Sequence, residues 1–365
     1  MDSFLNDKRI LVTGACGTVG SELIRQLLTD ETYQPTEVIG LDNNESALFF
    51  QDQQYLDEPR AHFYVTDIRD ADALCNKMHG VDIVFHAAAL KHVILCERSP
   101  EQAVQTNIQG VQNIITAAQA NGVEKVIFTS SDKAVNPTNV MGTSKLMGER
   151  MMTAANSNKR GSGPVFAATR FGNVLGSNGS VIPIFHNQIA KGGPVTLTHR
   201  DMTRFVMSIE ESVRLVIDSA VVARGGEVFI TKMPVIRIED LAQAMIAELS
   251  PVYGHRPEGI NITEIGTKPG EKLYEELMSP EETRRALELE RYFSVLPAFR
   301  GVYHDIDYDY PGLITQTVTN PYISADEIPL SVDVICQLLK DYKLLDSPDE
   351  QTSERYWPGD KEEKE

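Results

Sequence analysis

The stretch RILVTGACGTVG, residues 9–20, decides the fold. A short apolar run is followed by Gly14, Gly17 and Gly20 in a GxxGxxG spacing, and residues 21–28 then have the apolar spacing of an amphipathic helix. Glycine permits a positive φ angle and a close approach of the backbone to a ligand. A strand, a glycine turn and a helix in this order predict a dinucleotide site, with the pyrophosphate on the amides of the helix N-terminus.

Short apolar runs alternate with amphipathic stretches from this point to about residue 170. A strand followed by a helix, repeated, predicts a Rossmann-type doubly wound parallel sheet in the α/β class. Further strands are expected at residues 37–41, 62–65, 81–86, 125–129 and 165–170, and further helices at 103–121 and 142–155.

The alternation of short apolar runs with amphipathic stretches ends after residue 172, which predicts a division of the chain into three parts. Residues 1–172 are expected to form an NAD-binding Rossmann domain. Residues 173–345 are expected to form mainly a smaller substrate-binding lobe, with helices near 181–191, 209–223 and 238–249 and with room for strands that return to the main sheet. Residues 346–365 are rich in charge, Ser and Pro, which is typical of a disordered acidic tail.

Charge and cysteine usage narrow the functional class. A net charge of −18 argues against a nucleic-acid or anionic membrane surface, because such partners are bound mainly by Lys and Arg. The four cysteines have no close pairing, and His and Cys form no metal-binding motif, which predicts a reduced, cytoplasmic protein without a metal site. We expect no signal peptide and no membrane span, because spanning requires about 20 consecutive apolar residues.

Asp42 ends the second expected strand, roughly twenty residues after the glycine loop, where a carboxylate accepts from the adenosine ribose. Its charge repels a 2′-phosphate and the next three residues carry no Lys or Arg, so NAD is expected and NADP is the alternative. Asp67 is a candidate for the adenine amino group or an ordinary turn residue. The expected cofactor-binding residues are Gly14, Cys16, Gly17, Thr18, Val19, Gly20, Asp42, Asp67, Ile68, Ala87, Ala88 and Lys145.

The segment FTSSDKAVNPTNVMGTSK, residues 128–145, carries the expected chemistry. A strand ends in hydroxyls and a carboxylate, a loop turns at an Asn-Pro pair, and a helix follows. Met141 and Lys145 are four residues apart, which places them on one face of that helix. The expected catalytic residues are Ser131, Asp132, Lys133, Met141 and Lys145.

With FHAAALKHV (85–93), RFGNV (170–174) and KPGEKLYE (268–275), this segment resembles the extended short-chain dehydrogenases/reductases. Within them it is similar to the UDP-N-acetylglucosamine 4,6-dehydratases of polysaccharide biosynthesis. The resemblance implies oxidation at carbon 4, elimination across carbons 5 and 6, and hydride return to carbon 6. It also implies that Lys133, with a lowered pKa, is the carbon 5 base and that Asp132 is the acid at the 6-hydroxyl.

One departure concerns the YxxxK pair of the superfamily, whose Tyr is replaced here by Met141. The replacement resembles the branch that retains configuration at carbon 5. Methionine cannot carry a proton, so the 4-hydroxyl must lose its proton to another group. Lys145, Asp132 and a water relay through Ser130 or Ser131 are the candidates, and the sequence does not choose among them.

The nucleotide-sugar is expected to bind at the carboxyl edge of the sheet. Arg204 and Lys268 are the predicted partners of the diphosphate, with Lys where many relatives have Arg, and Glu271 is predicted to accept from the nucleoside ribose. A GDP-sugar would present the same groups and remains an alternative to the uridine nucleotide. The full set of expected substrate-binding residues is Lys91, His92, Asn173, Ser180, Val181, Pro183, Arg204, Lys268 and Glu271.

Two other functions remain open from the sequence. A nucleotide-sugar epimerase shares the fold and the cofactor but needs no acid beside a carbon 5 base. A non-catalytic NAD-binding regulator would explain the loss of the Tyr. The resemblance also implies a homo-oligomer, with residues 103–121 and 142–155 as candidate packing faces.

Overall fold

The computed structural model describes residues 4–159, 162–177, 181–267, 270–299 and 306–346. The chain forms two compact units. The first consists of Met1–Val174, Thr203–Val235 and Lys268–Pro329, and the second of Leu175–Met202, Ile236–Thr267 and Leu330–Glu365. The predicted residues Ser180 and Lys268 and the expected disorder of the acidic tail beyond residue 346 lie outside the described residues.

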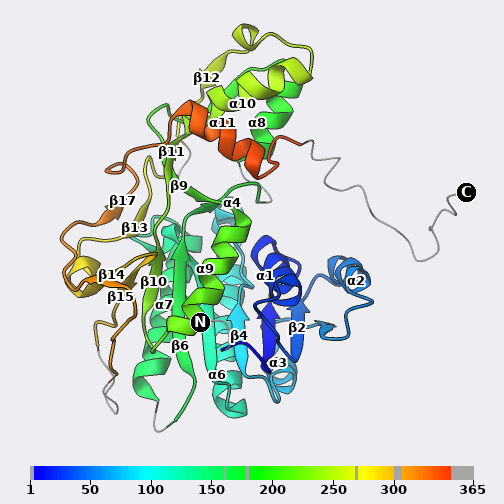
Figure 1. Ribbon diagram of the computed structural model, residues 1–365, viewed down its shortest axis with the longest axis vertical. Coiled ribbons are helices and arrows are strands. Elements are labelled where there is room, and N and C mark those ends of the chain that lie inside the picture. Colours follow the sequence, from blue (N-terminus) through cyan, green and yellow to red (C-terminus); the bar gives the residue numbers. More distant parts are fainter. Residues whose placement is uncertain (1–3, 160–161, 178–180, 268–269, 300–305, 347–365) are drawn as a thin grey trace, which may run out of the picture. The chain divides into compact units, whose positions relative to one another are not determined.

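The first unit is built on a ten-stranded sheet with the order β16-β14-β15-β10-β6-β5-β4-β1-β2-β3 (Figure 1). Neighbours from β10 to β3 run parallel, whereas β15, β14 and β16 are antiparallel. The strand order reverses between β1 and β4, which is the switch point at which open α/β sheets bind ligands. The predicted doubly wound Rossmann-type fold is confirmed. The strands of the sheet are β1 (Arg9–Thr13), β2 (Glu37–Asp42), β3 (Ala61–Val65), β4 (Ile83–His86), β5 (Lys125–Ser131), β6 (Val165–Phe171), β10 (Val228–Thr231), β14 (Ala286–Leu289), β15 (Tyr292–Val295) and β16 (Leu313–Thr315).

Helices cover both faces of this sheet (Figure 1). Helices α1 (Thr18–Thr29) and α9 (Ile209–Val222) pack together on one face, and α3 (Ala71–Lys77), α6 (Gly110–Asn121) and α7 (Val140–Asn158) on the other. Gln26 of α1 donates to the carbonyl oxygen of Glu210 over 3.0 Å. We expected residues 209–223 in the smaller lobe, and this was wrong, because the apolar face of α9 is buried against the main sheet.

The expected helix at 103–121 is divided. A short helix α5 (Pro100–Ala103) leads into a π-helical turn, η1 (Val104–Gln109), before α6 begins. The π-turn holds the buried amide of Asn107, which donates to the carbonyl of Leu90 and to the hydroxyl of Ser144, 2.9 Å each, and accepts from the Leu90 amide. Such local bulges allow a side chain to be redirected without ending the helix.

Several short elements complete the first unit. Five of them matter for the site. Strand β9 (Thr203–Met207) pairs with β7 (Asn173–Val174), and β13 (Glu276–Met278) pairs with β17 (Tyr322–Ile323). The 3-10 turn η2 (Asp132–Ala134) follows β5 directly. The others are α2 (Glu45–Gln54), α4 (Val93–Arg98) and η4 (Glu282–Arg285).

The second unit is a small helical assembly. Helix α10 (Ile238–Val252) packs against α8 (Val181–Ala190) and α11 (Val332–Asp341), and β8 (Val195–Leu197) pairs in parallel with β12 (Ile262–Glu264). The turn η3 (Pro257–Gly259) follows α10, and β11 (Val235–Arg237) precedes it. Among the described residues, no helix has both the length and the apolar character needed to cross a bilayer.

Candidate active site

The glycine loop between β1 and α1 is shaped for close contact with a ligand. Gly14 has φ +71°, and a Cβ there would lie 2.8 Å from the backbone of Ala88. A Cβ on Gly20 would collide with the carbonyl oxygen of Gly14. Within the described chain, α1 has Gly17 as its N-cap and no capping side chain. The first-turn amides, including those of Thr18 and Val19, are thus suited to a pyrophosphate.

Asp42, at the end of β2, is hydrogen-bonded to this loop. One carboxylate oxygen accepts from the Cys16 amide over 3.0 Å, and the other accepts from the Asn44 amide over 2.9 Å. Burial, reinforced by the Asp42 charge, raises the pKa of the Cys16 thiol to about 12, so the thiol stays neutral. The strand end and the loop therefore form one cradle whose donor amides and single carboxylate fit a dinucleotide without a 2′-phosphate.

The remaining predicted cofactor residues flank the cradle. Ala87 and Ala88 follow β4, and the Ala88 amide donates to the Thr13 hydroxyl over 3.3 Å. Ile68 is 6% exposed and packs on Gly110. Asp67 is bonded by the Arg69 guanidinium, which lowers the pKa of its carboxyl. Its predicted contact with adenine stays a prediction.

Asp132 and Lys133 form a contact pair where β5 ends. The Lys133 ammonium lies 3.1 and 3.0 Å from the two carboxylate oxygens of Asp132, and the Ser131 hydroxyl donates to one of them over 2.6 Å. The side chain of Asp132 is 3% exposed and that of Lys133 is 33% exposed. The end of β5 thus holds a buried carboxylate in contact with a partly exposed amine.

A second carboxyl group, from Glu275, joins this pair, although Glu275 was not among the residues predicted from the sequence. Its Oε1 lies 3.7 Å from the Lys133 ammonium and 3.2 Å from Nε of Arg204. The Asn173 amide donates to both of its oxygens, over 2.9 and 2.8 Å. Glu275 and Asp132 thus share the Lys133 ammonium, which lies 3.0 Å from Asp132 and 3.7 Å from Glu275. Two acids, Asp132 and Glu275, and two cations, Lys133 and Arg204, from three distant segments therefore meet in one cluster, called here the acidic cluster.

Protonation in the cluster is distributed unevenly. Burial, followed by the charge of Asp132, raises the pKa of Glu275 to about 7. Burial also acts to raise the pKa of Asp132, but Lys133 and the hydrogen-bond donors outweigh it, so that pKa is lowered. Desolvation acts to lower the pKa of Lys133, but the carboxylates of Asp132 and Glu275 outweigh it and raise the pKa. The expected lowering of the Lys133 pKa is not seen, because desolvation is outweighed first by the adjacent Asp132 and then by Glu275.

Lys145 lies in a different environment on α7. Its ammonium donates to the Thr129 carbonyl over 3.0 Å and lies 4.7 Å from the centroid of the Phe128 ring. Burial lowers the pKa of Lys145 to about 8. The hydroxyl of Ser130 is buried and has no hydrogen-bond partner within the described residues. A buried amine near its pKa can accept a proton at neutral to mildly basic pH.

Met141 is a packing residue. It is 3% exposed and clusters with the buried side chains of Cys96 and Ala103. The thioether fills the space between α7 and the preceding helices, which leaves no titratable group at this position.

The predicted substrate residues lie in different parts of the structure, and two of them contact Glu275. Asn173 and Arg204 both bind Glu275, and the Arg204 guanidinium also donates to the backbone carbonyls of Thr203 and Lys272. Arg204 thus supports the acidic cluster, and its predicted contact with a diphosphate stays a prediction. Lys91 and His92 are exposed at the start of α4, Glu271 is partly buried, and Val181 and Pro183 open α8 of the second unit.

A buried ion-pair network anchors the Glu275 segment. Arg170 of β6 is 1% exposed and binds Glu149 of α7 and Glu282, with shortest contacts of 2.6 and 3.1 Å. The same guanidinium donates to the Leu277 carbonyl of β13 over 2.7 Å. The strand that follows Glu275 is therefore fixed to the central sheet.

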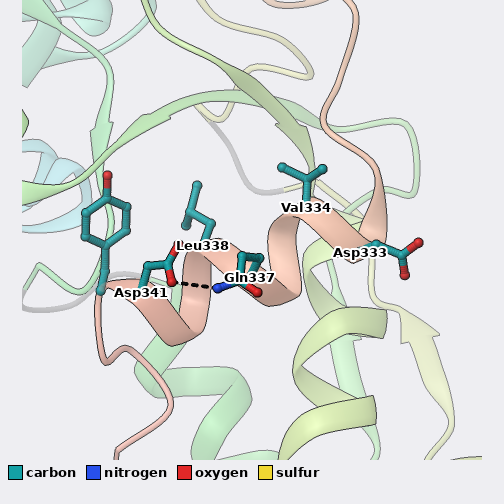
Figure 2. A pocket seen from close by; sticks show the side chains of 6 residues that line it. Asp333, Val334, Gln337, Leu338 and Asp341 are labelled. Atoms are coloured by element: carbon teal, nitrogen blue, oxygen red, sulfur yellow. Dashed lines mark hydrogen bonds between the residues drawn. The ribbon is translucent and has the colours of Figure 1, made fainter.

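A second pocket with reactive side chains or a metal site would be a rival candidate for the active site. A hollow of about 370 Å³ lies along α11 in the second unit, where Gln337 donates to Asp341 over 2.6 Å. Figure 2 shows the side chains that line it. The residues that line this hollow belong to α11 and to Tyr342 just after it, and they form no acid-base pair. Among the described residues, no group of His, Cys, Asp or Glu is arranged to hold a metal ion.

Comparison with known proteins gives the same picture over most of the chain. Residues 10–297 match the family model described as "Polysaccharide biosynthesis protein". A Methanocaldococcus jannaschii protein described as an uncharacterized membrane protein is 50% identical over 81% of this chain and 88% of its own. The inverting UDP-N-acetylglucosamine 4,6-dehydratase of Campylobacter jejuni is 37% identical over 84% of this chain and 88% of its own. A UDP-glucose 4-epimerase of Rickettsia bellii is 40% identical over 79% of this chain and 83% of its own.

Two solved structures extend the comparison. Pen from Bacillus thuringiensis is 39% identical, with a TM-score of 0.85 over 94% of this chain and all of that one. DesIV from Streptomyces venezuelae, a dTDP-glucose 4,6-dehydratase with NAD and TYD bound, is 25% identical. Its TM-score is 0.61 over 73% of this chain and 86% of its own.

Proposed function

The chain belongs to the polysaccharide biosynthesis protein family, and from that premise we propose that it is a 4,6-dehydratase acting on UDP-N-acetylglucosamine. The predicted resemblance is confirmed, and the chain is an NAD-dependent enzyme of the nucleotide-sugar dehydratase and epimerase type. The product of the proposed reaction is the 4-keto-6-deoxy sugar.

The contact pair of Asp132 and Lys133 is the observation that carries the proposal. Bound NAD supplies the oxidant for carbon 4 and returns the hydride at carbon 6. Oxidation of carbon 4 acidifies the carbon 5 hydrogen, and elimination then needs a base at carbon 5 and an acid at the 6-hydroxyl. Lys133 and Asp132 are the two groups, 3.0 Å apart, that can divide this work.

The resting pair must exchange one proton to reach its reactive form. An ammonium cannot remove the carbon 5 proton, and a carboxylate cannot protonate the leaving hydroxyl. Transfer of one proton from Lys133 to Asp132 converts the ion pair into an amine and a carboxylic acid. Substrate that displaces water from the pair favours this exchange, since a neutral pair is less costly to desolvate than an ionic one.

We assign removal of the 4-hydroxyl proton to Lys145. The support is its buried position, with a pKa of about 8, whereas Asp132 and Ser131 are bonded to each other. Ser130 remains the alternative, as part of a water relay. The predicted nucleotide-binding roles of Lys91, Arg204 and Glu271 are retained as parts of this proposal.

A nucleotide-sugar epimerase is the second candidate, favoured by the similarity to the Rickettsia bellii epimerase. Incubation of the purified protein with UDP-N-acetylglucosamine in heavy water separates the two. The dehydratase releases one water and fixes one deuteron at carbon 5, as read by mass spectrometry and proton NMR. A product of unchanged mass would reject the dehydratase, and product only from a GDP-sugar would replace the uridine nucleotide.

Self-association is part of the proposal. Exposed apolar side chains lie on neighbouring helical segments of the first unit: Ile94 and Leu95 on α4, Val104 on η1 and Met147 on α7. Contact between copies would remove this apolar surface from water. Sedimentation of the full chain tests it, and a monomer at micromolar concentration would reject it.

A further inference from the structure

The acidic cluster contains one carboxyl group more than the elimination needs. Glu275 is buried, with its side chain 5% exposed, and it lies immediately before β13. It is held by Asn173, Arg204 and the Phe205 amide, the last over 3.2 Å. A buried acid with this many partners is positioned as firmly as Asp132 itself.

Glu275 and Asp132 are two buried carboxyls beside one ammonium, that of Lys133, at 3.7 and 3.0 Å, and a proton on one of them relieves their repulsion. Two carboxylates repel each other, and they form a hydrogen bond only when one of them is protonated. The hydrogen-bond donors and Lys133 keep Asp132 ionised, and the shared proton therefore resides on Glu275. The cluster thus stores one proton beside the acid that the proposed reaction uses.

The proton balance of the proposed reaction calls for such a store. During elimination Lys133 gains the carbon 5 proton, and Asp132 loses one to the 6-hydroxyl, which leaves as water. When the hydride returns to carbon 6, carbon 5 must be protonated again, and Lys133 gives back the proton that it took. The Asp132–Lys133 pair then holds one proton fewer than at the start. The oxidation at carbon 4 releases one proton, which restores the total.

We propose that Glu275 recharges the catalytic pair, passing its proton to Asp132 after each turnover and regaining one, through solvent, from the proton released at the 4-hydroxyl. The inference rests on the proposed dehydratase function. It makes Glu275 a positioning and proton-storing residue that acts through Asp132. It needs no co-reactant beyond the substrate and water.

The test compares single and multiple turnovers of the holoenzyme carrying Glu275→Gln. The amide keeps the size and neutral charge of a protonated Glu275 but cannot release a proton at the required pKa. We expect the single-turnover rate of water loss to stay within about threefold of the unmodified enzyme. We expect the steady-state rate to fall at least about a hundredfold, at the low end of the effect of general acids.

The pH dependence gives the second readout. The store is filled when Glu275 is protonated, so the steady-state rate of the unmodified enzyme should fall as pH rises through about 7. That descending limb should be missing in Glu275→Gln and present in Glu275→Asp, which restores a carboxyl. Glu276→Gln is the matched control, since Glu276 is adjacent and binds Lys272 and Asn136 instead of the pair. Glu276→Gln should keep both the steady-state rate and its decrease as pH rises through about 7.

Equal slowing of single and multiple turnovers, with no recovery in Glu275→Asp, would mean that Glu275 is only a structural acceptor. An unchanged steady-state rate in Glu275→Gln would also overturn the proposal. Infrared spectra of the holoenzyme at pH about 6 test the stored proton without substrate: the carboxylic acid band must be present, and lost in Glu275→Gln. An unmodified enzyme that releases no water from UDP-N-acetylglucosamine would instead reject the proposed function.

Discussion

Lys133 and Lys145 stand only twelve residues apart in the sequence, and the protein gives them opposite protonation behaviour. Lys133 lies beside Asp132 and Glu275, whose charges raise its pKa in spite of desolvation. Lys145 lies against the Phe128 ring and a backbone carbonyl, and burial lowers its pKa to about 8. One amine is held as a cation, and the other is held near the point of losing its proton.

The difference suits two separate tasks of the proposed reaction, removal of the 4-hydroxyl proton and removal of the carbon 5 proton. With Met141 in place of the Tyr, the proposed reaction needs an acceptor for the 4-hydroxyl proton that is ready in the resting protein, and we assign this role to Lys145. The carbon 5 proton becomes acidic only after oxidation, so Lys133 can remain charged until the substrate arrives. Neighbouring carboxylates, more than burial, determine which lysine has which state.

Lys133→Met should have the largest effect. It removes the proposed carbon 5 base, and we expect product formation to fall about 10³ to 10⁴-fold, within the range attributed to general bases. Reduction of the bound cofactor by substrate, followed by its near-ultraviolet absorbance, should persist, because that step depends on Lys145. Lys232→Met is a control, since Lys232 is also partly buried and pairs with a glutamate, Glu288. Product formation near the unmodified rate would remove Lys133 from the mechanism.

Arg170→Met tests the support of the acidic cluster. The substitution leaves Glu149 and Glu282 buried without their shared cation, and we expect the free energy of unfolding to fall by about 3–5 kcal/mol. Urea unfolding of the full chain measures it. A variant with Glu149 and Glu282 also changed to Gln should recover part of the loss, and no recovery would assign the cost to packing alone.

The same network predicts the response to acid. Burial opposes ionisation of Glu282, but Arg170 outweighs it and lowers the pKa of Glu282 to about 2. A lowered folded-state pKa stabilises the protein above the ordinary value of about 4.5, and the gain is lost as pH falls from there towards 2. In Arg170→Met the unpaired carboxyls should reverse this slope, so that the variant gains stability between pH 7 and 5. A parallel pH profile for both proteins would contradict the assignment.

Lys145→Met tests the second of the two lysines compared above. We expect cofactor reduction to slow about a hundredfold, because the 4-hydroxyl loses its proton acceptor. In the unmodified enzyme the neutral amine is the active form, so the reduction rate should rise with pH through about 8 and then level off. Survival of both the rate and the pH profile in Lys145→Met would favour the relay through Ser130.

The sequence predicted the parallel half of the sheet well, because each strand there is a short apolar run between turn residues. It missed the division of residues 103–121, since a π-turn depends on the buried bonds of Asn107 to Leu90 and Ser144. It assigned α9 to the wrong lobe, because an amphipathic pattern reveals a buried face but not the sheet that covers it.

The candidate site was predicted in part for a similar reason. Asp132 and Lys133 are adjacent in sequence, and their pairing needed only the strand end. Glu275 reaches them through the pairing of β13 with β17 and the bonds of its backbone to Ser324, which are long-range contacts. The motif KPGEKLYE contains two glutamates, Glu271 and Glu275, each three residues after a lysine, so its residue types alone do not distinguish them.

Met141→Tyr should have the smallest effect of the four and asks whether the proton route has truly left this position. The pocket between Cys96 and Ala103 is closed, so the larger ring must displace its neighbours. We expect a folded protein whose free energy of unfolding falls by about 1–3 kcal/mol, the usual cost of overpacking. Turnover should be unchanged within about threefold if Lys145 serves the 4-hydroxyl alone, with Met141→Leu as a size-matched control. A rise in turnover, with the alkaline dependence on Lys145 lost, would mean that the phenol has taken the proton and that the two lysines are less independent than their surroundings indicate.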